Sequence, residues 1–407
     1  MFLTLKGIGK IKDSTIEMNG ITVIAGENNT GKSTFGKVLY CIFNAFHDSE
    51  TAIRNERINS IRRILRNYIR LLNLRSIPKS MIEELLSTDD IRGKIVDIIN
   101  TIDKISIDDS TIDKLQENIE RFISIGNEEI QKMLITRFLR LEFAGKVNHI
   151  NKSGDVGKIT LKIKGKTIET TIKSDECTNY SDAIGIIYDA IYFDTPFVMD
   201  NLRSYNRFPD SYNMNNHRND IFERLCRKSI DITLLEEAII KQKINNILLN
   251  INSVVAGEFK EEEEGIFFKE NNMQKPLPIQ NISTGLKTFL IIKRLLEMGH
   301  IKDRGILILD EPEIHLHPDW QVRFAEMLVL LQKEFDLSIL LTTHSPYFLH
   351  AIEIFSGKYN LRKQLTCYLA ESKKDISVIR NVTDNIDAIY KQLAQPFQTL
   401  EDIRYND

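Results

Sequence analysis

A glycine-rich segment near the amino terminus has the residue types and the spacing of a phosphate-binding loop. Residues 26–33 have the sequence GENNTGKS and match the pattern GxxxxGK[ST] in full. Its glycines let backbone N–H groups turn inward around phosphate oxygens, and a helix that starts at Lys32 adds the positive end of its dipole. Lys32 would pair with the β- and γ-phosphates, and Ser33 would offer its hydroxyl to Mg²⁺. The residues expected to contact the bound group are Gly26, Asn28, Asn29, Thr30, Gly31, Lys32, Ser33 and Thr34.

Two acidic residues, Asp310 and Glu311, follow the apolar run Ile306 to Leu309. The run predicts a central strand without a solvated face, so the carboxylates should lie at its carboxyl edge, facing solvent or metal. Asp310 would hold Mg²⁺ through water, and Glu311 would polarise an attacking water. A charged turn after a strand is common, but together with the phosphate loop the pair strongly indicates a hydrolytic site.

Two further segments could contribute to the same site. The segment 282–287 (ISTGLK) precedes an amphipathic stretch, and its local pattern favours a plain helix cap by Ser283 or Thr284, with a second anion site as the alternative. His344 follows an expected strand, 337–341. A lone histidine is more often structural. Its position at the end of a parallel strand, downstream of the acidic pair, favours contact with a γ-phosphate.

The elements that must position these residues change in character along the chain. A β-branched strand before the glycine loop and a helical run after it favour phosphate binding over a chance turn. Later parts contain a predicted hairpin, a buried strand ending at Asp194, and an alternation of helix and strand that is typical of parallel α/β structure. We expect four parts: 1–48 with two strands, the loop and a helix, 49–143 as a helical insertion, 144–275 with strands and helices, and 276–407 with the acidic strand and His344.

Composition narrows the class of protein. The 407 residues carry 54 basic and 57 acidic side chains, a net charge of −3, so any contact with nucleic acid would depend on a local patch. The four cysteines form no CxxC pair, which disfavours a zinc site or a disulfide framework. There is no signal-peptide pattern and no apolar run long enough to cross a bilayer, so we expect a cytoplasmic protein without membrane contact.

The order of glycine loop, Ser-x-Gly helix start, Asp-Glu strand and histidine strand resembles the ABC ATPase superfamily. More narrowly, the chain is similar to the branch that holds the SMC-like repair ATPases and the OLD-type (overcoming lysogenisation defect) ATPases. The fragment 310–318 (DEPEIHLHP) is typical of OLD-like and antiphage-defence ATPases. The resemblance covers residues 1–48 and about 276–350. It implies an α/β fold, an ABC-type ATPase head with a mixed or parallel sheet and a P-loop, into which a helical domain is inserted.

The resemblance also implies roles for site residues and partners. ATP and Mg²⁺ would be the cofactors, with Ser33 and Asp310 near the metal and Lys32, Glu311 and His344 as catalytic residues, Glu311 being the base. Ser283 and Gly285 of one subunit would contact the γ-phosphate held by the other, so two ATP molecules would lie within a symmetric homodimer or a higher oligomer. The chain departs from the family pattern at Thr284, where a second glycine is usual, and in lacking an obvious loop glutamine, for which Asp194 is one candidate.

Three functional hypotheses remain open. The first is a dimeric nucleotide switch or scaffold that controls a separate effector, a nuclease or toxin, in bacterial antiphage defence. Only 63 residues follow His344, too few for the fused nuclease of OLD proteins. The second is a DNA-repair or chromosome-associated ATPase that grips DNA through region 54–75. The third is a nucleotide-gated scaffold that does not hydrolyse ATP. Region 54–75 could equally be a solvated helix face or a docking site for an acidic protein, and its basic residues are Arg54, Arg57, Arg62, Arg63, Arg66, Arg70 and Arg75.

Overall fold

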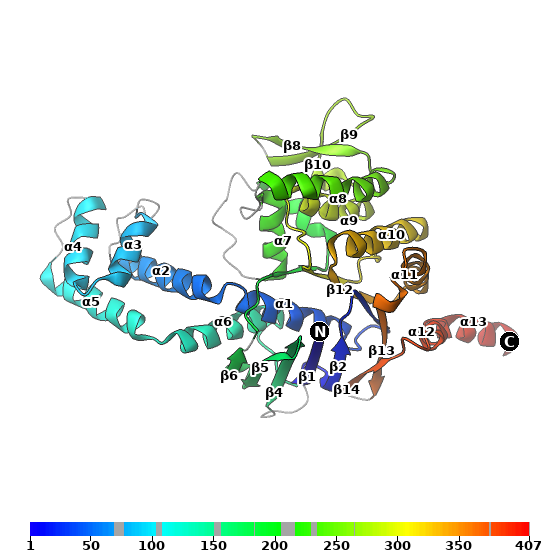
Figure 1. The fold of residues 1–407 in the computed structure, drawn as a ribbon, viewed down its shortest axis with the longest axis horizontal. Coiled ribbons are helices and arrows are strands. Elements are labelled where there is room, and N and C mark those ends of the chain that lie inside the picture. Colours follow the sequence, from blue (N-terminus) through cyan, green and yellow to red (C-terminus); the bar gives the residue numbers. More distant parts are fainter. Residues whose placement is uncertain are drawn as a thin grey trace. The chain divides into compact units, whose positions relative to one another are not determined.

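Two compact units make up the chain. A computed structural model describes residues 1–68, 77–102, 108–149, 156–182, 184–204, 216–228, 234–263, 265–373 and 376–406. We call Met1–His47 together with Thr136–Asp407 the head unit, and Asp48–Ile135 the helical unit. The head unit is α/β and the helical unit is all helix, which confirms the predicted fold class, an α/β head interrupted by helices (Figure 1).

The head unit is built on one large mixed sheet. Among the described residues the sheet has 11 strands, in the order β6-β5-β4-β1-β2-β14-β13-β3-β12-β11-β7. The run β13-β3-β12-β11-β7 is parallel, whereas β1, β2, β4, β5 and β6 pair as antiparallel neighbours. The bounds are β1 Phe2–Ile8, β2 Ile11–Glu17, β3 Ile21–Gly26, β4 Gly157–Ile163, β5 Lys166–Lys173, β6 Glu176–Asp182, β7 Ala190–Phe193, β11 Ile306–Asp310, β12 Ser338–Thr343, β13 Leu365–Lys373 and β14 Ile376–Asn381.

Helices cover both faces of the parallel part, which explains why its strands are apolar along their whole length. On one face, alternate strand residues such as Val23, Leu309 and Leu341 belong to the main core with α7 to α11. On the other face α1 packs against β3, β7, β11 and β12. The helices are α1 Lys32–Phe46, α6 Asn127–Glu142, α7 His217–Cys226, α8 Leu234–Asn252, α9 Thr284–Glu297, α10 Pro318–Phe335, α11 Pro346–Lys358, α12 Asp387–Leu393 and α13 Gln395–Asn406.

The first part of the chain contains one more strand than expected. We predicted two strands before the glycine loop, and the structure has three, because β1 and β2 form an antiparallel hairpin whose register ends at the pair Ile8 and Ile11. Gly9 has a φ of 53° in the connecting turn, a left-handed conformation that glycine adopts readily. The hairpin predicted around Gly165 is present as β4 and β5. A small antiparallel sheet follows α8, with β8 Gly257–Glu262, β9 Gly265–Glu270 and β10 Leu277–Pro278.

Short helices that share an apolar core form the helical unit. The core is almost entirely isoleucine and leucine, and includes Ile61, Leu85, Ile95 and Leu115, each with none of its surface exposed. The helices that supply it are α2 Ser49–Tyr68, α3 Lys79–Ser87, α4 Ile91–Ile102 and α5 Asp109–Ser124.

Arg57 is a structural residue of this helical unit. Its guanidinium donates to the carbonyl oxygens of Phe122, Ile123 and Ile125 and to Oδ1 of Asn127, at distances from 2.6 to 3.0 Å. These carbonyls belong to the last turn of α5 and to its C-cap residue Ile125, where backbone acceptors lack helical partners. Among the other arginines of the predicted basic region, Arg54 lies 3.5 Å from Glu83, whereas Arg63 is exposed. Arg70, Arg75 and the side chain of Arg66 lie outside the described residues.

Replacing Arg57 by alanine is therefore expected to destabilise the helical unit by about 2 kcal/mol, because several carbonyls lose a charged donor. Hydrogen exchange should show faster exchange of the amides of α5 and of the first turns of α6. The matched control is Arg63→Ala on the same helix, for which the change should stay within about 0.5 kcal/mol. Equal exchange in both variants would contradict the structural role of Arg57.

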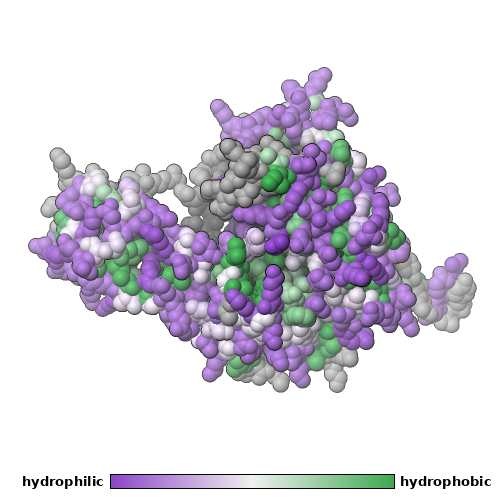
Figure 2. Space-filling model, in the orientation of Figure 1, coloured by the Kyte–Doolittle hydropathy of each residue, from purple (hydrophilic) through white to green (hydrophobic). Residues whose placement is uncertain are grey.

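The surface of the protein is predominantly hydrophilic on the face drawn in Figure 2. In the part of the chain that the structure describes, no helix combines the length and the apolar character that crossing a lipid bilayer requires.

Candidate functional site

The glycine loop connects the end of β3 to the start of α1. Gly26 has a φ of 151°, and a Cβ there would lie 2.3 Å from the carbonyl oxygen of Ala370, so no other residue fits without displacing β13. Gly31 is the N-cap residue of α1, with a φ of 80° and no side chain to cap the helix, and the first turn of α1 carries no acidic residue. The first N–H groups of α1 therefore have no capping side chain and no acidic residue in their own turn, which suits an anionic ligand.

Lys32 connects the loop to the acidic pair. Only 4% of its side chain is exposed, and Nζ donates to the carbonyl oxygens of Gly26 and Glu27 at 2.9 and 2.8 Å. The same Nζ lies 3.1 Å from Oε1 of Glu311. The two motifs, far apart in the sequence, thus meet at one edge of the sheet.

Asp310 lies beside Ser33 at that edge. Oδ1 of Asp310 accepts hydrogen bonds from Ser33 Oγ at 3.0 Å and from the hydroxyl of Thr342 on the neighbouring strand β12. The described residues contain no cluster of three or more histidine, cysteine or acidic side chains that could enclose a metal ion. A carboxylate and a hydroxyl side by side are oxygen donors of the kind Mg²⁺ prefers, and Mg²⁺ usually completes its shell with water and phosphate oxygens. The donor set fits Mg²⁺ bound together with a nucleotide.

Glu311 is ionised and lies between two basic groups. Its φ of 49° is uncommon for a residue other than glycine, and its backbone N–H donates to the carbonyl oxygen of Thr342 at 3.1 Å. Nδ1 of His344 lies 3.5 Å from its Oε2. The hydrogen bond from His344 and the charge of Lys32 lower the pKa of Glu311 to about 2, and the hydrogen bond with Glu311 raises the pKa of His344. An ionised carboxylate here can accept a proton from water.

Glu313 is a buried carboxyl group that sequence reasoning missed. Only 1% of its side chain is exposed, and Oε1 accepts from the hydroxyl of Thr343 and from the backbone N–H of His344 at 3.2 Å. Burial raises the pKa of Glu313. On the other side of His344, the hydroxyl of Ser345 caps α11 by accepting from the N–H of Phe348. Both contacts fix the backbone that presents the histidine.

The remaining loop residues differ in exposure. Asn28 and Asn29 are exposed, and Asn29 accepts from Nζ of Lys10, which lies in the β1–β2 turn, at 2.5 Å. The hydroxyl of buried Thr30 donates to the carbonyl oxygen of Glu27 at 2.8 Å, which tightens the loop. Thr34 is partly exposed in the first turn of α1.

Ser283 and Gly285 lie at the start of α9 and make no helix cap through a side chain. Ser283 is exposed and occupies the N-cap position, but its hydroxyl forms no capping hydrogen bond, so the plain cap favoured by the local pattern is wrong. Gly285 is buried, and a Cβ there would lie 2.8 Å from the carbonyl oxygen of His315 and 3.0 Å from the ring of Trp320. The helix start therefore packs closely on the loop that follows Glu311.

Asp194, the candidate for the missing loop glutamine, is engaged in an ion cluster. It lies 3.0 Å from Nε2 of His217 and 2.5 Å from the guanidinium of Arg218, and Nδ1 of His217 lies 2.6 Å from Glu142. Burial disfavours the charged forms of both Asp194 and His217. The carboxylates nevertheless raise the pKa of His217 to about 9, and His217 and Arg218 lower the pKa of Asp194 to about 2. In this structure Asp194 therefore forms ion pairs with side chains of the head unit.

This cluster gives stability a pH dependence of defined direction. Because the pKa of His217 is raised from 6.5 to about 9 by folding, its stabilising effect is complete below about pH 6.5 and is lost as the pH rises through 9. We expect the melting temperature to fall over this interval, and to fall less in His217→Gln. Thermal unfolding followed by circular dichroism from pH 6 to 10 measures both. Parallel curves for the two proteins would contradict the assignment.

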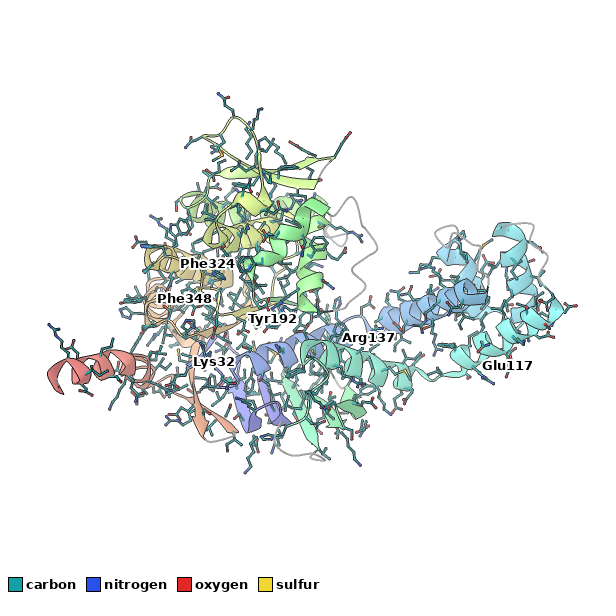
Figure 3. All side chains as sticks on the ribbon, turned by 180° about the vertical axis from the view of Figure 1, so that it is seen from behind. Lys32, Glu117, Arg137, Tyr192, Phe324 and Phe348 are labelled. Carbon is teal, nitrogen blue, oxygen red and sulfur yellow. The ribbon has the colours of Figure 1, made fainter. Side chains whose placement is uncertain are left out.

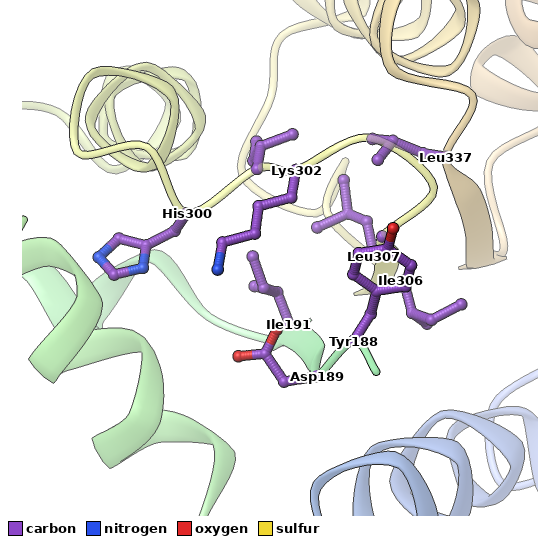
Figure 4. Close-up of a pocket in the computed structure, with 10 residues that line it drawn as sticks. Tyr188, Asp189, Ile191, His300, Lys302, Ile306, Leu307 and Leu337 are labelled. Carbon is purple, nitrogen blue, oxygen red and sulfur yellow. The ribbon is translucent and has the colours of Figure 1, made fainter. Parts of the chain in front are cut away.

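The pocket in Figure 4 lies where β7 and β11 begin, whereas the acidic pair lies where β11 ends. It is lined by residues that precede or begin β7 and β11, among them Tyr188, His300 and Ile306, whereas the glycine loop follows the end of β3. Its volume is about 10 Å³, room for about one water molecule, so it is too small for a nucleotide.

Comparisons with known proteins identify a family and several similar proteins. Residues 1–349 match the family described as the AAA ATPase domain. A protein of Geobacter sulfurreducens named as an ABC transporter ATP-binding protein is 37% identical over 82 residues, 19% of this chain and 28% of that protein. An Escherichia coli protein named as the ATPase of retron Ec83 is 33% identical over 95 residues, 21% of this chain and 17% of that protein. The SMC head domain from Thermotoga maritima aligns over 94% of this chain and 98% of its own, with 12% identity and a TM-score of 0.42.

Proposed function

Because the chain belongs to the AAA ATPase domain family, we propose that it binds ATP with Mg²⁺ at the glycine loop and hydrolyses it with the help of the acidic pair. The observation that carries this proposal is the meeting of the two motifs. Lys32 lies 3.1 Å from Glu311, and Ser33 lies 3.0 Å from Asp310.

Each side chain has a separate task in the proposed reaction. Lys32 exchanges its contacts with the loop carbonyls and Glu311 for phosphate oxygens, since a cation prefers the more highly charged partner. Ser33 and Asp310 hold Mg²⁺, which neutralises charge on the phosphates when bound. Glu311, freed from Lys32, accepts a proton from the attacking water. His344 is positioned beside Glu311 to contact the γ-phosphate.

We propose that the active form is a head-to-head homodimer, alone or within a higher oligomer. Ser283 is exposed, makes no cap, and starts α9, whose N-terminal N–H groups can bind an anion. Ser283 and Gly285 of one subunit would complete the γ-phosphate site of the other. Close packing of Gly285 on His315 supports a rigid connection between this helix start and the loop after Glu311.

The biological role we propose is a cytoplasmic ATPase switch in bacterial antiphage defence that controls a separate effector, a nuclease or a toxin. The resemblance of the fragment 310–318 to antiphage ATPases and the similarity to a protein named as a retron ATPase support it. The matched stretches are less than a third of either named relative, so the activity and partners of this chain stay part of the proposal.

The alternatives make different predictions for the same molecule. A DNA-binding ATPase would use the basic region 54–75, but Arg57 is already bound to carbonyl oxygens of the helical unit and Arg54 lies near Glu83. The described arginines therefore offer less free charge than the sequence indicated. A non-hydrolysing scaffold would bind ATP and dimerise without releasing phosphate.

Mixing two inactive variants tests the composite dimer site. Lys32→Met removes the phosphate-binding charge of the loop, and Ser283→Arg prevents the start of α9 from contacting the γ-phosphate of the partner subunit. Each variant alone should therefore lose ATP hydrolysis. In a mixed dimer one of the two sites combines an intact loop with an intact helix start. A 1:1 mixture should thus regain about a quarter of the wild-type sites if dimers exchange freely and the sites act independently. No recovery, with subunit exchange verified by light scattering and labelled subunits, would contradict a site shared between subunits.

A further inference from the structure

Tyr192 contacts the carboxylate of Asp310 from a neighbouring strand. Its hydroxyl donates to Oδ2 at 3.0 Å, the oxygen that Ser33 and Thr342 leave free. The sheet register explains the reach: Tyr192 on β7 pairs with Ile308 on β11, and Asp310 is two residues further on the same face. The long phenol side chain spans this diagonal. Both oxygens of Asp310 thereby have donors from the protein.

The ring of Tyr192 is itself held in place. It is fully buried and stacks on the imidazole of His217 with 4.3 Å between centroids and 27° between planes. The centroid of the Tyr40 ring lies 6.1 Å from that of Tyr192. Helix α1 also comes close, because a Cβ added at Gly36 would lie 3.7 Å from the Tyr192 ring. Figure 3 labels Tyr192 and Lys32 within the head unit.

His217 is in turn fixed by two carboxylates and so cannot easily turn away from the ring. Glu142 and Asp194 lie 2.6 and 3.0 Å from its two ring nitrogens, and the backbone N–H of His217 donates to Glu142 at 2.7 Å. Glu142 is the last residue of α6, and its side chain is 1% exposed. Its backbone carbonyl accepts from Nζ of Lys37 on α1 at 3.0 Å. A continuous series of contacts therefore leads from the end of α6 to Asp310.

We infer that Tyr192 is a positioning residue for the metal-site carboxylate of Asp310, and that His217, clamped by Glu142 and Asp194, holds Tyr192 in that position. This inference rests on the proposed function, in which Asp310 serves Mg²⁺. A hydrogen bond to one carboxylate oxygen fixes the direction of the other, so the oxygen beside Ser33 stays aimed at the metal without a loss of rotational freedom on binding. A tyrosine that only filled the core would contribute to stability and leave metal affinity unchanged.

The test is the affinity for Mn²⁺, a substitute for Mg²⁺ with oxygen ligands, in the presence of a non-hydrolysable ATP analogue. Electron paramagnetic resonance of free Mn²⁺ reports binding without any turnover. Tyr192→Phe keeps the stacked ring and removes the hydroxyl, and it should weaken Mn²⁺ binding roughly tenfold. Tyr40→Phe is the matched control, because it removes a hydroxyl from the same buried cluster without touching Asp310, and it should bind Mn²⁺ like the wild type.

The role of His217 is tested by a double-mutant cycle on the same affinity. If His217 acts through Tyr192, then His217→Gln should weaken Mn²⁺ binding in the wild-type background and have no further effect beside Tyr192→Phe. Should His217→Gln fail to fold, Glu142→Gln takes its place in the cycle. Additive effects would overturn the part assigned to His217. Unchanged Mn²⁺ affinity in Tyr192→Phe, or an equal loss in Tyr40→Phe, would overturn the inference. Failure of the wild type to bind the analogue would instead refute the proposed function.

Discussion

Glu311→Gln is expected to slow steady-state ATP hydrolysis by roughly 10²- to 10⁴-fold, the usual contribution of a general base. The amide has the size of the carboxylate but cannot accept the proton of the attacking water. Mg²⁺·ATP should still bind, because the side chains that hold the phosphates and the metal remain. Phosphate release and calorimetric titration with ATP measure the two effects separately.

Glu313→Gln is the matched control for this experiment. Glu313 lies two residues away and is buried, and its oxygen accepts from Thr343 and from the backbone of His344, a role that an amide oxygen can fill. Burial already favours its uncharged form, so hydrolysis should change little. Equal rates for wild type and Glu311→Gln would remove Glu311 as the base. Negligible turnover by the wild type, with tight ATP binding, would favour the non-hydrolysing scaffold.

Lys32→Met is expected to weaken ATP binding by roughly ten- to a hundredfold and to slow hydrolysis of bound ATP by a further 10²-fold or so. The ammonium is nearly buried and is held by the two loop carbonyls and Glu311, so it is already directed into the loop before a nucleotide arrives. Methionine keeps most of the length and loses the charge. Calorimetry at saturating Mg²⁺ gives the affinity, and single-turnover phosphate release gives the rate.

Lys37→Met, one and a half turns later on α1, is the control for charge on the same helix. Its Nζ donates to the carbonyl of Glu142 and lies 5.7 Å from the centre of the Phe143 ring, away from the loop. ATP affinity should stay within a factor of about two of the wild type, since this charge touches no part of the proposed site. A loss of affinity equal to that of Lys32→Met would mean that Lys32 makes no specific contact with phosphate.

The sequence predicted the fold class and the family correctly because both depend on local patterns of known geometry. A GxxxxGK[ST] segment between a β-branched strand and a helix restricts the backbone to one arrangement, and an apolar run that ends in Asp310 and Glu311 leaves the carboxylates only the edge of the sheet. The resemblance to ABC-type P-loop ATPases related to antiphage ATPases is confirmed by the family match and by the named relatives. The roles of individual site residues stay predictions.

Other features of the site could not be predicted because they depend on contacts between distant segments. Tyr192 is a buried residue of β7, but its hydroxyl contact with Asp310 follows from the pairing of β7 with β11, which no local pattern specifies. His217 and Glu142 come from two further segments. The hydroxyl of Tyr192 in an otherwise apolar strand did indicate that a hydrogen-bond partner must lie nearby, since a buried hydroxyl needs one.

The basic region 54–75 also depends on contacts between distant segments, and here the sequence indicated more free charge than the structure has. The number of arginines indicated a cationic helix face, whereas in the structure Arg57 donates hydrogen bonds to carbonyl oxygens at the end of α5. Sequence spacing gives the helix on which a charge lies, but not the acceptors that another helix brings to it. The local pattern likewise favoured a cap by Ser283 or Thr284. Ser283 is the N-cap residue of α9, but its side chain forms no capping hydrogen bond.

The glycine loop and the acidic pair are expected to form one site for a magnesium-bound nucleotide. Isothermal titration of the wild type and of Asp310→Asn with ATP, each with Mg²⁺ and with chelator, tests it most directly. We predict saturable binding by the wild type that is strengthened by Mg²⁺, and binding by Asp310→Asn that has lost most of this dependence on the metal. No binding by the wild type, or the same gain from Mg²⁺ in both proteins, would contradict a shared site for the nucleotide and the metal.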